Sequence, residues 1–232
     1  MQKNRFFNEI NLSIIIGFLL LATGLFIAQN YNFDLAIQNY FFQPKNNSWI
    51  IDKDEPIKKF IFYKLPKILL GIAIVILLII LIFNIKNRSK IKYYNKIFLT
   101  FLGLTLIPLC AGNIKKFTNV YCPNQLEIYG GKYPYVKILD HYPADFKQEK
   151  KGKCFPAGHS ITGFSLMILF FVFNKFLYRF LALTFAITLG WILGLYQMAK
   201  GVHFFSDTMI SMICCFIIAA LIARCFYSKK ME

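Results

Sequence analysis

Two of the three histidines in this 232-residue chain stand where a polar segment meets an apolar one. One of them, His203, precedes Asp207 by four residues, so on a helix both side chains would lie on one face. The carboxylate could then accept a hydrogen bond from one ring nitrogen and leave the other nitrogen free as a base or nucleophile. This spacing is typical of a histidine that acts as a base or a nucleophile. The alternative is that the two residues form a buried structural pair.

The other histidine, His159, belongs to the segment "PAGHS", residues 156–160, directly before an apolar stretch. Gly158 would let the backbone come close to a ligand. Free N–H groups at the start of a helix bind anions, so a phosphoryl group would suit this position. Ser160 could also simply cap the helix, and His159 could have a structural role.

A third polar segment, residues 113–123, follows an earlier apolar stretch and contains Lys115. His203 lies in a comparable segment, residues 196–207. If the apolar stretches cross a membrane, these two segments and residues 156–160 reach the same face. We therefore expect them to form one pocket, because ionisable groups at such a depth usually have a function.

The apolar stretches are the elements that must position these segments. Hydrophobic residues make up 57 % of the chain, more than the ~45–50 % of an ordinary soluble domain. A helix needs about 20 mostly apolar residues to cross a bilayer. The windows that reach or approach this length are residues 11–29, 66–85, 97–112, 159–174, 179–198 and 207–226. We predict an all-α, polytopic membrane bundle of six helices, a single domain over residues 1–232 with its active site on the outer face.

Charged residues near the windows predict the orientation. Lys3 and Arg5 before the first window also fit a secretory signal, but the apolar run exceeds the usual ~7–15 residues and no small-residue cleavage site closes it. Residues 84–96 contain five Lys or Arg and should be cytoplasmic, as should both termini, with Lys229 and Lys230 at the second. The site would then face the periplasm of a bacterial inner membrane. Both outer loops also carry lysines, which count less in long loops.

The net charge of +16 indicates an anionic partner. No compact basic and aromatic module is present, so nucleic acid is not expected. The lipid bilayer surface and a phosphorylated membrane lipid are the expected partners, and no protein partner is implied. Part of this net charge is explained by lysines that only fix the orientation of the helices in the membrane.

The first outer loop contains a segment with the periodicity of an amphipathic helix. Ile57, Phe60 and Ile61 would lie on one face, with Trp49 and Tyr63 as interfacial anchors. This pattern fits a short helix lying in the membrane interface, and packing against the bundle is an equal alternative.

Two of the six cysteines lie near opposite ends of the long outer loop. In an oxidising compartment, Cys122 and Cys154 are expected to form a disulfide that joins the two ends. The others fall within apolar windows. No metal is expected, because two thiols without a nearby Cys/His pair do not supply the four ligands that zinc usually takes.

These segments resemble the type 2 phosphatidic acid phosphatase superfamily, whose pattern is K-x6-R-P, P-S-G-H and S-R-x5-H-x3-D. The matching residues are Lys115, Pro123, Pro156, Gly158, His159, His203 and Asp207. The departures are Cys122 and Gln197 at the arginine positions and Ala157 and Tyr196 at serine positions. The resemblance covers roughly residues 100–210 and implies a membrane lipid phosphatase without a metal or other cofactor.

The resemblance also implies a two-step phosphoryl transfer. His203, oriented by Asp207, would attack phosphorus and become a phosphohistidine, and His159 would protonate the leaving oxygen and later activate water. The groups expected to hold the phosphate are Lys115, the amides of Gly158 and His159, and the hydroxyl of Ser160.

The two absent arginines leave a transferring phosphoryl group short of cations. Lys200 and Lys153 lie close in sequence to the motifs and could replace them, and we favour Lys200. Lysine does not provide the bidentate grip of arginine. A divergent member with another substrate, or a phosphotransferase, is the alternative interpretation.

The substrate is expected to be a lipid phosphate or diphosphate. Six lysines over residues 132–153 would match a headgroup with several negative charges. The layout resembles lipid A 1-phosphatases of the family, including "FDLAIQNYFF" and "KKFIFYKLP" in the first outer loop. Phosphatases of undecaprenyl diphosphate and of phosphatidylglycerophosphate share the motifs, and a non-catalytic lipid-binding protein is a further alternative.

Overall fold

The computed structural model describes residues 2–52, 54–87 and 93–228, most of which are helical. The helices are α1 (Gln2–Asn30), α2 (Phe33–Asn39), α3 (Pro56–Lys59), α4 (Leu65–Phe83), α5 (Tyr94–Asn113), α6 (Ile161–Phe164), α7 (Leu169–Val172), α8 (Phe176–Ala199) and α9 (Phe205–Ser228). Two short strands, β1 (Phe42–Gln43) and β2 (Ser48–Trp49), pair antiparallel. Lys229, Lys230 and residues 88–92 of the predicted cytoplasmic connection lie outside the described residues.

Within the described residues, five helical stretches are long and apolar enough to cross a membrane. They are Arg5–Asn30, Pro56–Phe83, Tyr94–Lys116, Phe176–Ala199 and Phe205–Ser228. Large apolar side chains on these stretches face outward, as at Leu19, Ile72 and Phe185. A bilayer matches such a surface, so the prediction of a helical, multi-pass membrane protein is confirmed in outline.

The fourth predicted window, residues 159–174, forms a shorter element. Helix α6 continues through a 3₁₀ turn, Ser165–Ile168, into α7. The whole of Ile161–Val172 is only about 20 Å long, whereas the hydrocarbon core is about 30 Å thick. The predicted count of six spanning helices is therefore not established.

This short element lies at the centre of the bundle, against α5, α8 and α9. Phe164 and Ile168 are fully buried. Its backbone also approaches α8 closely, because a Cβ atom on Gly163 would lie 2.5 Å from the backbone nitrogen of Gly190. The close packing fixes the start of α6, and this in turn fixes His159 just before it.

The predicted interfacial helix around residues 57–64 is not a separate element. Helix α3 continues through a π-helical turn, Phe60–Lys64, directly into α4. Trp49 is likewise not a membrane anchor, because it packs against the rings of Phe42 and Tyr129. The apolar run of α4 extends the helix back to Pro56, and the extra residue of the π turn rotates the side chains before it.

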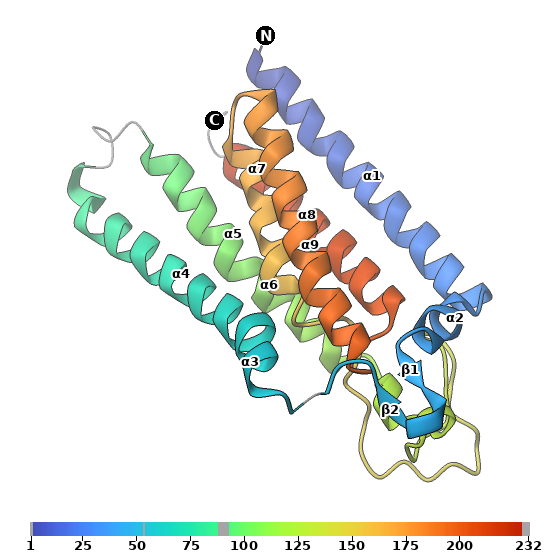
Figure 1. The fold of residues 1–232 in the computed structure, drawn as a ribbon. Helices are drawn as coiled ribbons and strands as arrows, with labels where there is room; N and C mark the ends of the chain where they lie inside the picture. Colours follow the sequence, from blue (N-terminus) through green and yellow to red (C-terminus); the bar gives the residue numbers. More distant parts are fainter. Residues whose placement is uncertain (1, 53, 88–92, 229–232) are drawn as a thin grey trace.

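The two ends of the bundle differ in character (Figure 1). The start of α1, the end of α4, the start of α5 and the end of α9 lie at one end. The opposite end carries α2, the β1–β2 ribbon and the long segment between α5 and α6. The helix ends next to the predicted cytoplasmic segments thus share one side, and the three polar segments lie on the other.

Candidate active site

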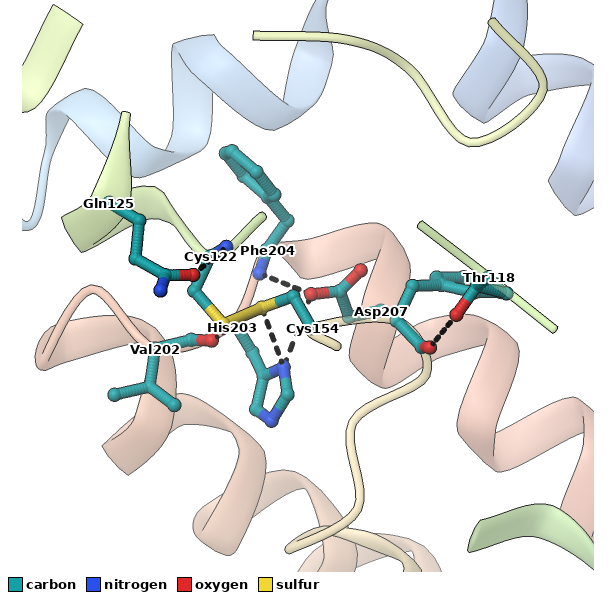
Figure 2. The surroundings of a disulfide bond; sticks show 9 residues. Thr118, Cys122, Gln125, Cys154, Val202, His203, Phe204 and Asp207 are labelled. Atoms are coloured by element: carbon teal, nitrogen blue, oxygen red, sulfur yellow. Dashed lines mark hydrogen bonds and ion pairs between the residues drawn. A yellow bond between two sulfur atoms is a disulfide. The ribbon is translucent and has the colours of Figure 1, made fainter. Parts of the chain in front are cut away.

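His203 and Asp207 form a buried pair at the start of α9. His203 lies in the turn after α8, and its Nδ1 atom is 3.2 Å from Oδ2 of Asp207. The same oxygen accepts the backbone N–H of Phe204 at 3.0 Å, so the carboxylate is held from two directions (Figure 2). With the proton on Nδ1, the lone pair lies on Nε2, which is buried and has no partner among the described residues.

A disulfide lies against this histidine. Cys122 and Cys154 are bonded, with Cα atoms 5.0 Å apart, and Sγ of Cys154 is 3.4 Å from Nδ1 of His203 (Figure 2). A disulfide sulfur has no proton to donate, so Asp207 is the hydrogen-bond partner of Nδ1. The bond joins the segment after α5 to the segment before α6, and so joins two of the three polar segments.

The same neighbourhood contains a set of potential metal donors. Cys154, His203 and Asp207 bring donor atoms within 4.8 Å of one another. The sulfur of Cys154 belongs to the disulfide and is no thiolate, so two donors remain. These residues do not fit a metal centre.

His159 faces His203 from the other side of the site. The ring centroids of the two histidines are 5.9 Å apart. Nδ1 of His159 is buried and has no hydrogen-bond partner in the described part of the chain. Burial, followed by the positive charges around it, lowers the pKa of His159 to about 2, and burial lowers the pKa of His203 well below its usual value. Both rings are therefore neutral in the empty site.

Lys115 and Gly158 lie side by side. Lys115 lies in the 3₁₀ turn Ile114–Lys116 that follows α5. A Cβ atom on Gly158 would lie 3.3 Å from its Nζ atom, so the absence of a side chain on this residue leaves room for the ammonium. The amides of Gly158 and His159 donate no hydrogen bond within the described residues. An ammonium and two free N–H groups at one point are suited to an anion.

Lys200 lies at the end of α8 with only 6 % of its surface exposed. Its Nζ atom is 4.9 Å from the ring centroid of Tyr196, and no carboxylate of the described chain pairs with it within 4 Å. Burial is the main cause that lowers its pKa. Lys153, the alternative cation, is exposed and lines an outer hollow beside Lys150 and Lys151.

Ser160 does not have the contact expected of it. Its side chain is fully buried, and its hydroxyl donates to the carbonyl oxygen of Ala157 at 2.8 Å. The hydroxyl proton is therefore already used inside the turn. Ser160 also forms no side-chain cap on α6. In this geometry it shapes the turn that carries Gly158 and His159.

Two site residues that the sequence patterns missed are Tyr63, in the π-helical turn before α4, and Lys67, at the start of α4. The ring of Tyr63 lies 4.5 Å from the ring of His159, centroid to centroid. Nζ of Lys67 lies 4.2 Å from the centroid of Tyr63. The sequence signal that could have found them was Lys67, a charged residue directly before a long apolar run.

Helix α2 holds the turn between α8 and α9. Asp34 accepts the backbone N–H of Ser206 at 2.9 Å and also the hydroxyl of that residue. Gln38, one turn later on α2, donates to the carbonyl oxygen of Met198 at 2.9 Å. Both side chains are buried. Asp34 satisfies a free N–H at the start of α9, and Gln38 adds a second bond to a carbonyl at the end of α8 that also accepts the N–H of Gly201, so the two residues fix the turn between the helices. The sequence signal for this role was the pair of polar residues, four positions apart, in the otherwise mostly apolar segment "FDLAIQN".

The family model described as PAP2 superfamily matches residues 96–231, more than half of the chain. The matched range contains the three polar segments and begins after α4, so α2, Tyr63 and Lys67 lie outside it. Comparisons with curated proteins and with solved structures found no match.

Proposed function

Because the chain belongs to the PAP2 superfamily, whose members are phosphatases, we propose that it is a membrane lipid phosphatase that works through a phosphohistidine. The observation that carries the proposal is the pair of histidines, each with a buried ring nitrogen. Nε2 of His203 and Nδ1 of His159 both lack partners among the described residues, and the rings lie 5.9 Å apart. A phosphorus atom between them could be attacked from one side while its leaving oxygen is protonated from the other.

The reaction has two steps. Nε2 of His203 attacks phosphorus, the bond to the leaving oxygen breaks, and His159 donates a proton to that oxygen. Water, which loses a proton to His159, then attacks the phosphohistidine and releases inorganic phosphate. Asp207 accepts the Nδ1 proton of His203 in a hydrogen bond throughout, which stabilises the positive charge that develops on the ring.

The phosphate oxygens are held by cations and amides. Lys115, with the N–H groups of Gly158 and His159, would bind one side of the phosphate, and Lys200 would bind another. Ser160 supports the turn from within. These groups supply the positive charge that the reaction needs, and no cofactor is part of the proposal.

His159 must carry a proton when substrate is bound, although burial and neighbouring charges lower its pKa in the empty site. A phosphate dianion placed between the histidine and the lysines would offset these charges and favour the protonated ring. Substrate binding and protonation of His159 are therefore coupled in this mechanism.

A lipid substrate is supported by the apolar surface below the site. A cavity of about 420 Å³ lies between α4, α6 and α8, and its wall includes Phe62, Leu69, Thr162 and Ile192. Thr162 is three residues after His159, so a hydrocarbon chain in this cavity would leave its headgroup near the histidines. We propose lipid A at the periplasmic face of a bacterial inner membrane as the substrate, with the phosphate at its 1-position removed.

Related lipids are the alternatives within the same chemistry. Undecaprenyl diphosphate and phosphatidylglycerophosphate present the same phosphate to the site, and transfer to a second lipid in place of water would make the protein a phosphotransferase. Incubation of the purified protein with each of the three lipids, followed by mass measurement of the products, separates these possibilities. A protein that turns over none of them would be a lipid-binding member without catalysis.

The role of His203 is tested with a matched histidine. His203→Ala should abolish phosphate release and the acid-labile phosphate on the protein, whereas His141→Ala, at an exposed position on the outer segment, should keep both. Full activity of a folded His203→Ala protein would exclude the mechanism.

A further inference from the structure

The ring of Tyr63 lies close to three charged or titratable groups. Its ring lies 4.5 Å from the ring of His159, 4.2 Å from Nζ of Lys67 and 5.8 Å from Nζ of Lys200. Both ammonium groups are within the range of a cation–π contact. The tyrosine ring therefore links the start of α4 to a histidine before α6 and to the turn after α8.

Local helix geometry brings Tyr63 and Lys67 together. The two residues are four positions apart, so their side chains lie on the same face of the helix. Tyr63 lies in the π-helical turn Phe60–Lys64, and Lys67 is the third residue of α4. Helices with a single π turn often carry functional residues there, because the turn redirects side chains.

The charge of Lys67 acts on the site. It is one of the charges that lower the pKa of His159, with those of Lys115 and Lys200. Within the described chain no carboxylate pairs with Lys67 within 4 Å. Lys67 is itself exposed, but its ammonium lies over the ring of Tyr63, which in turn contacts His159. A lysine that only reached for the membrane interface would not need this contact.

We propose that Lys67, held over the ring of Tyr63, is the third cation of the phosphate site and takes the place of an arginine that the family pattern expects. The proposal rests on the proposed function and extends it. With Lys115 and Lys200, the site then has three ammonium groups from three different elements. This number matches a phosphate dianion or a diphosphate better than a singly charged phosphodiester.

The residue at one expected arginine position, Gln197, cannot supply a positive charge to the phosphate. Gln197 is 1 % exposed, and both polar atoms of its amide lack partners in the described part of the chain. A neutral amide can donate a hydrogen bond but cannot balance charge. Tyr63 is a positioning residue in this arrangement, since it holds the lysine and contacts His159 without reaching the reacting atoms.

Binding of inorganic phosphate to the detergent-solubilised full chain, measured by calorimetry, tests Lys67 without any need for turnover. Lys67→Gln should weaken phosphate binding about tenfold, and Lys67→Arg should stay within about threefold of wild type. Lys64→Gln is the matched control. It removes an exposed charge three residues away that does not act on either histidine, and its binding should equal that of wild type.

A second readout separates a charge effect from a structural one. Removing the positive charge of Lys67 should raise the pKa of His159, so the alkaline limb of the pH profile, where phosphate binding weakens as His159 loses its proton, should move to higher pH in Lys67→Gln and not in Lys67→Arg. Tyr63→Phe keeps the ring and should behave as wild type, whereas Tyr63→Leu should reproduce the loss seen in Lys67→Gln.

The proposal is overturned if Lys67→Gln binds phosphate like wild type, or if Lys64→Gln loses as much. Failure of the proposed function is a different result. In that case wild-type protein would bind phosphate with the same dependence on Lys67 but would turn over none of the three lipids.

Discussion

The rings of His159 and His203 lie 5.9 Å apart although 44 positions separate them in the chain. His159 is fixed by the close packing of α6 on α8, and His203 is fixed by Asp207 at the start of α9. The two rings therefore border one site, which is where the proposed mechanism places the phosphoryl group. The proposed chemistry depends on this spacing, so changes in the residues that fix either ring should change the rate.

Asp207→Asn should lower the rate of phosphate release from lipid A by at least ~100-fold while the protein still folds. One oxygen of Asp207 accepts both the N–H of Phe204 and the Nδ1 proton of His203, so the asparagine oxygen can keep both contacts. The amide is neutral, however, and cannot balance the positive charge that develops on the imidazole during attack on phosphorus. Kinetics together with thermal unfolding of the variant measure both effects. A folded variant with the wild-type rate would remove Asp207 from the mechanism.

Asp34→Ala should lower both stability and activity, although Asp34 does not touch the histidines. The N–H and the hydroxyl of Ser206 would lose their acceptor in a buried place, which costs about 1–3 kcal/mol for a group left unsatisfied. The turn that carries His203 would then be less well fixed, and the rate constant should fall more than the apparent substrate affinity.

Asp34→Asn is the matched control for this prediction. Its oxygen can accept the N–H of Ser206, and its amide can donate to the hydroxyl. We expect its melting temperature and rate to stay close to those of wild type, measured by thermal unfolding and steady-state kinetics. Equal losses in the alanine and asparagine variants would mean that the charge of Asp34, and not its hydrogen bonds, is required.

Loss of the disulfide should destabilise the outer segment. The bond closes a loop between Cys122 and Cys154, with a sequence separation of 32, for which chain entropy predicts about 3–4 kcal/mol. The double variant Cys122→Ala, Cys154→Ala should unfold at lower temperature and release phosphate more slowly, because Cys154 also packs against His203. Cys110→Ala, which removes an exposed free cysteine, is the control. An unchanged melting temperature and rate in the double variant would contradict this role.

Motif spacing and the order of the apolar windows together predicted which three segments meet. His203 and Asp207 are four residues apart, so their contact follows from helix geometry, and the apolar windows bring the remaining segments to the same end. The exact extent of the helices could not be predicted in the same way. Residues 159–174 only approach the length of a span by composition, and close packing on Gly190 and a 3₁₀ turn shorten the helical part further.

Contacts between distant elements were beyond the sequence patterns. Tyr63 read as a membrane anchor, and only the π turn before α4 rotates its ring onto His159. Asp34 and Gln38 read as part of a loop, because their partners Ser206 and Met198 lie more than 150 residues further on. Such contacts depend on how helices pack, which periodicity does not describe.

Acidification should destabilise the protein without substrate. Burial lowers the pKa of His159 and His203 below the ordinary value of about 6.5. Below that pH the unfolded chain binds protons on these rings while the folded chain does not, so the free energy of unfolding falls as the pH drops. Asp34 opposes this in part, because burial raises its pKa to about 6 and the folded chain takes up that proton first.

Thermal unfolding between about pH 7.5 and pH 5.5 measures the balance between the destabilising effect of the two histidines and the opposing effect of Asp34. The melting temperature of wild type should fall over this range, and that of His159→Gln should fall less, because the variant lacks one of the two histidines that must stay neutral. His141→Gln, at an exposed position, should follow wild type. Added inorganic phosphate should reduce the fall in wild type, since a bound anion favours the protonated ring of His159. A melting temperature that rises on acidification in wild type would contradict the burial of these two histidines.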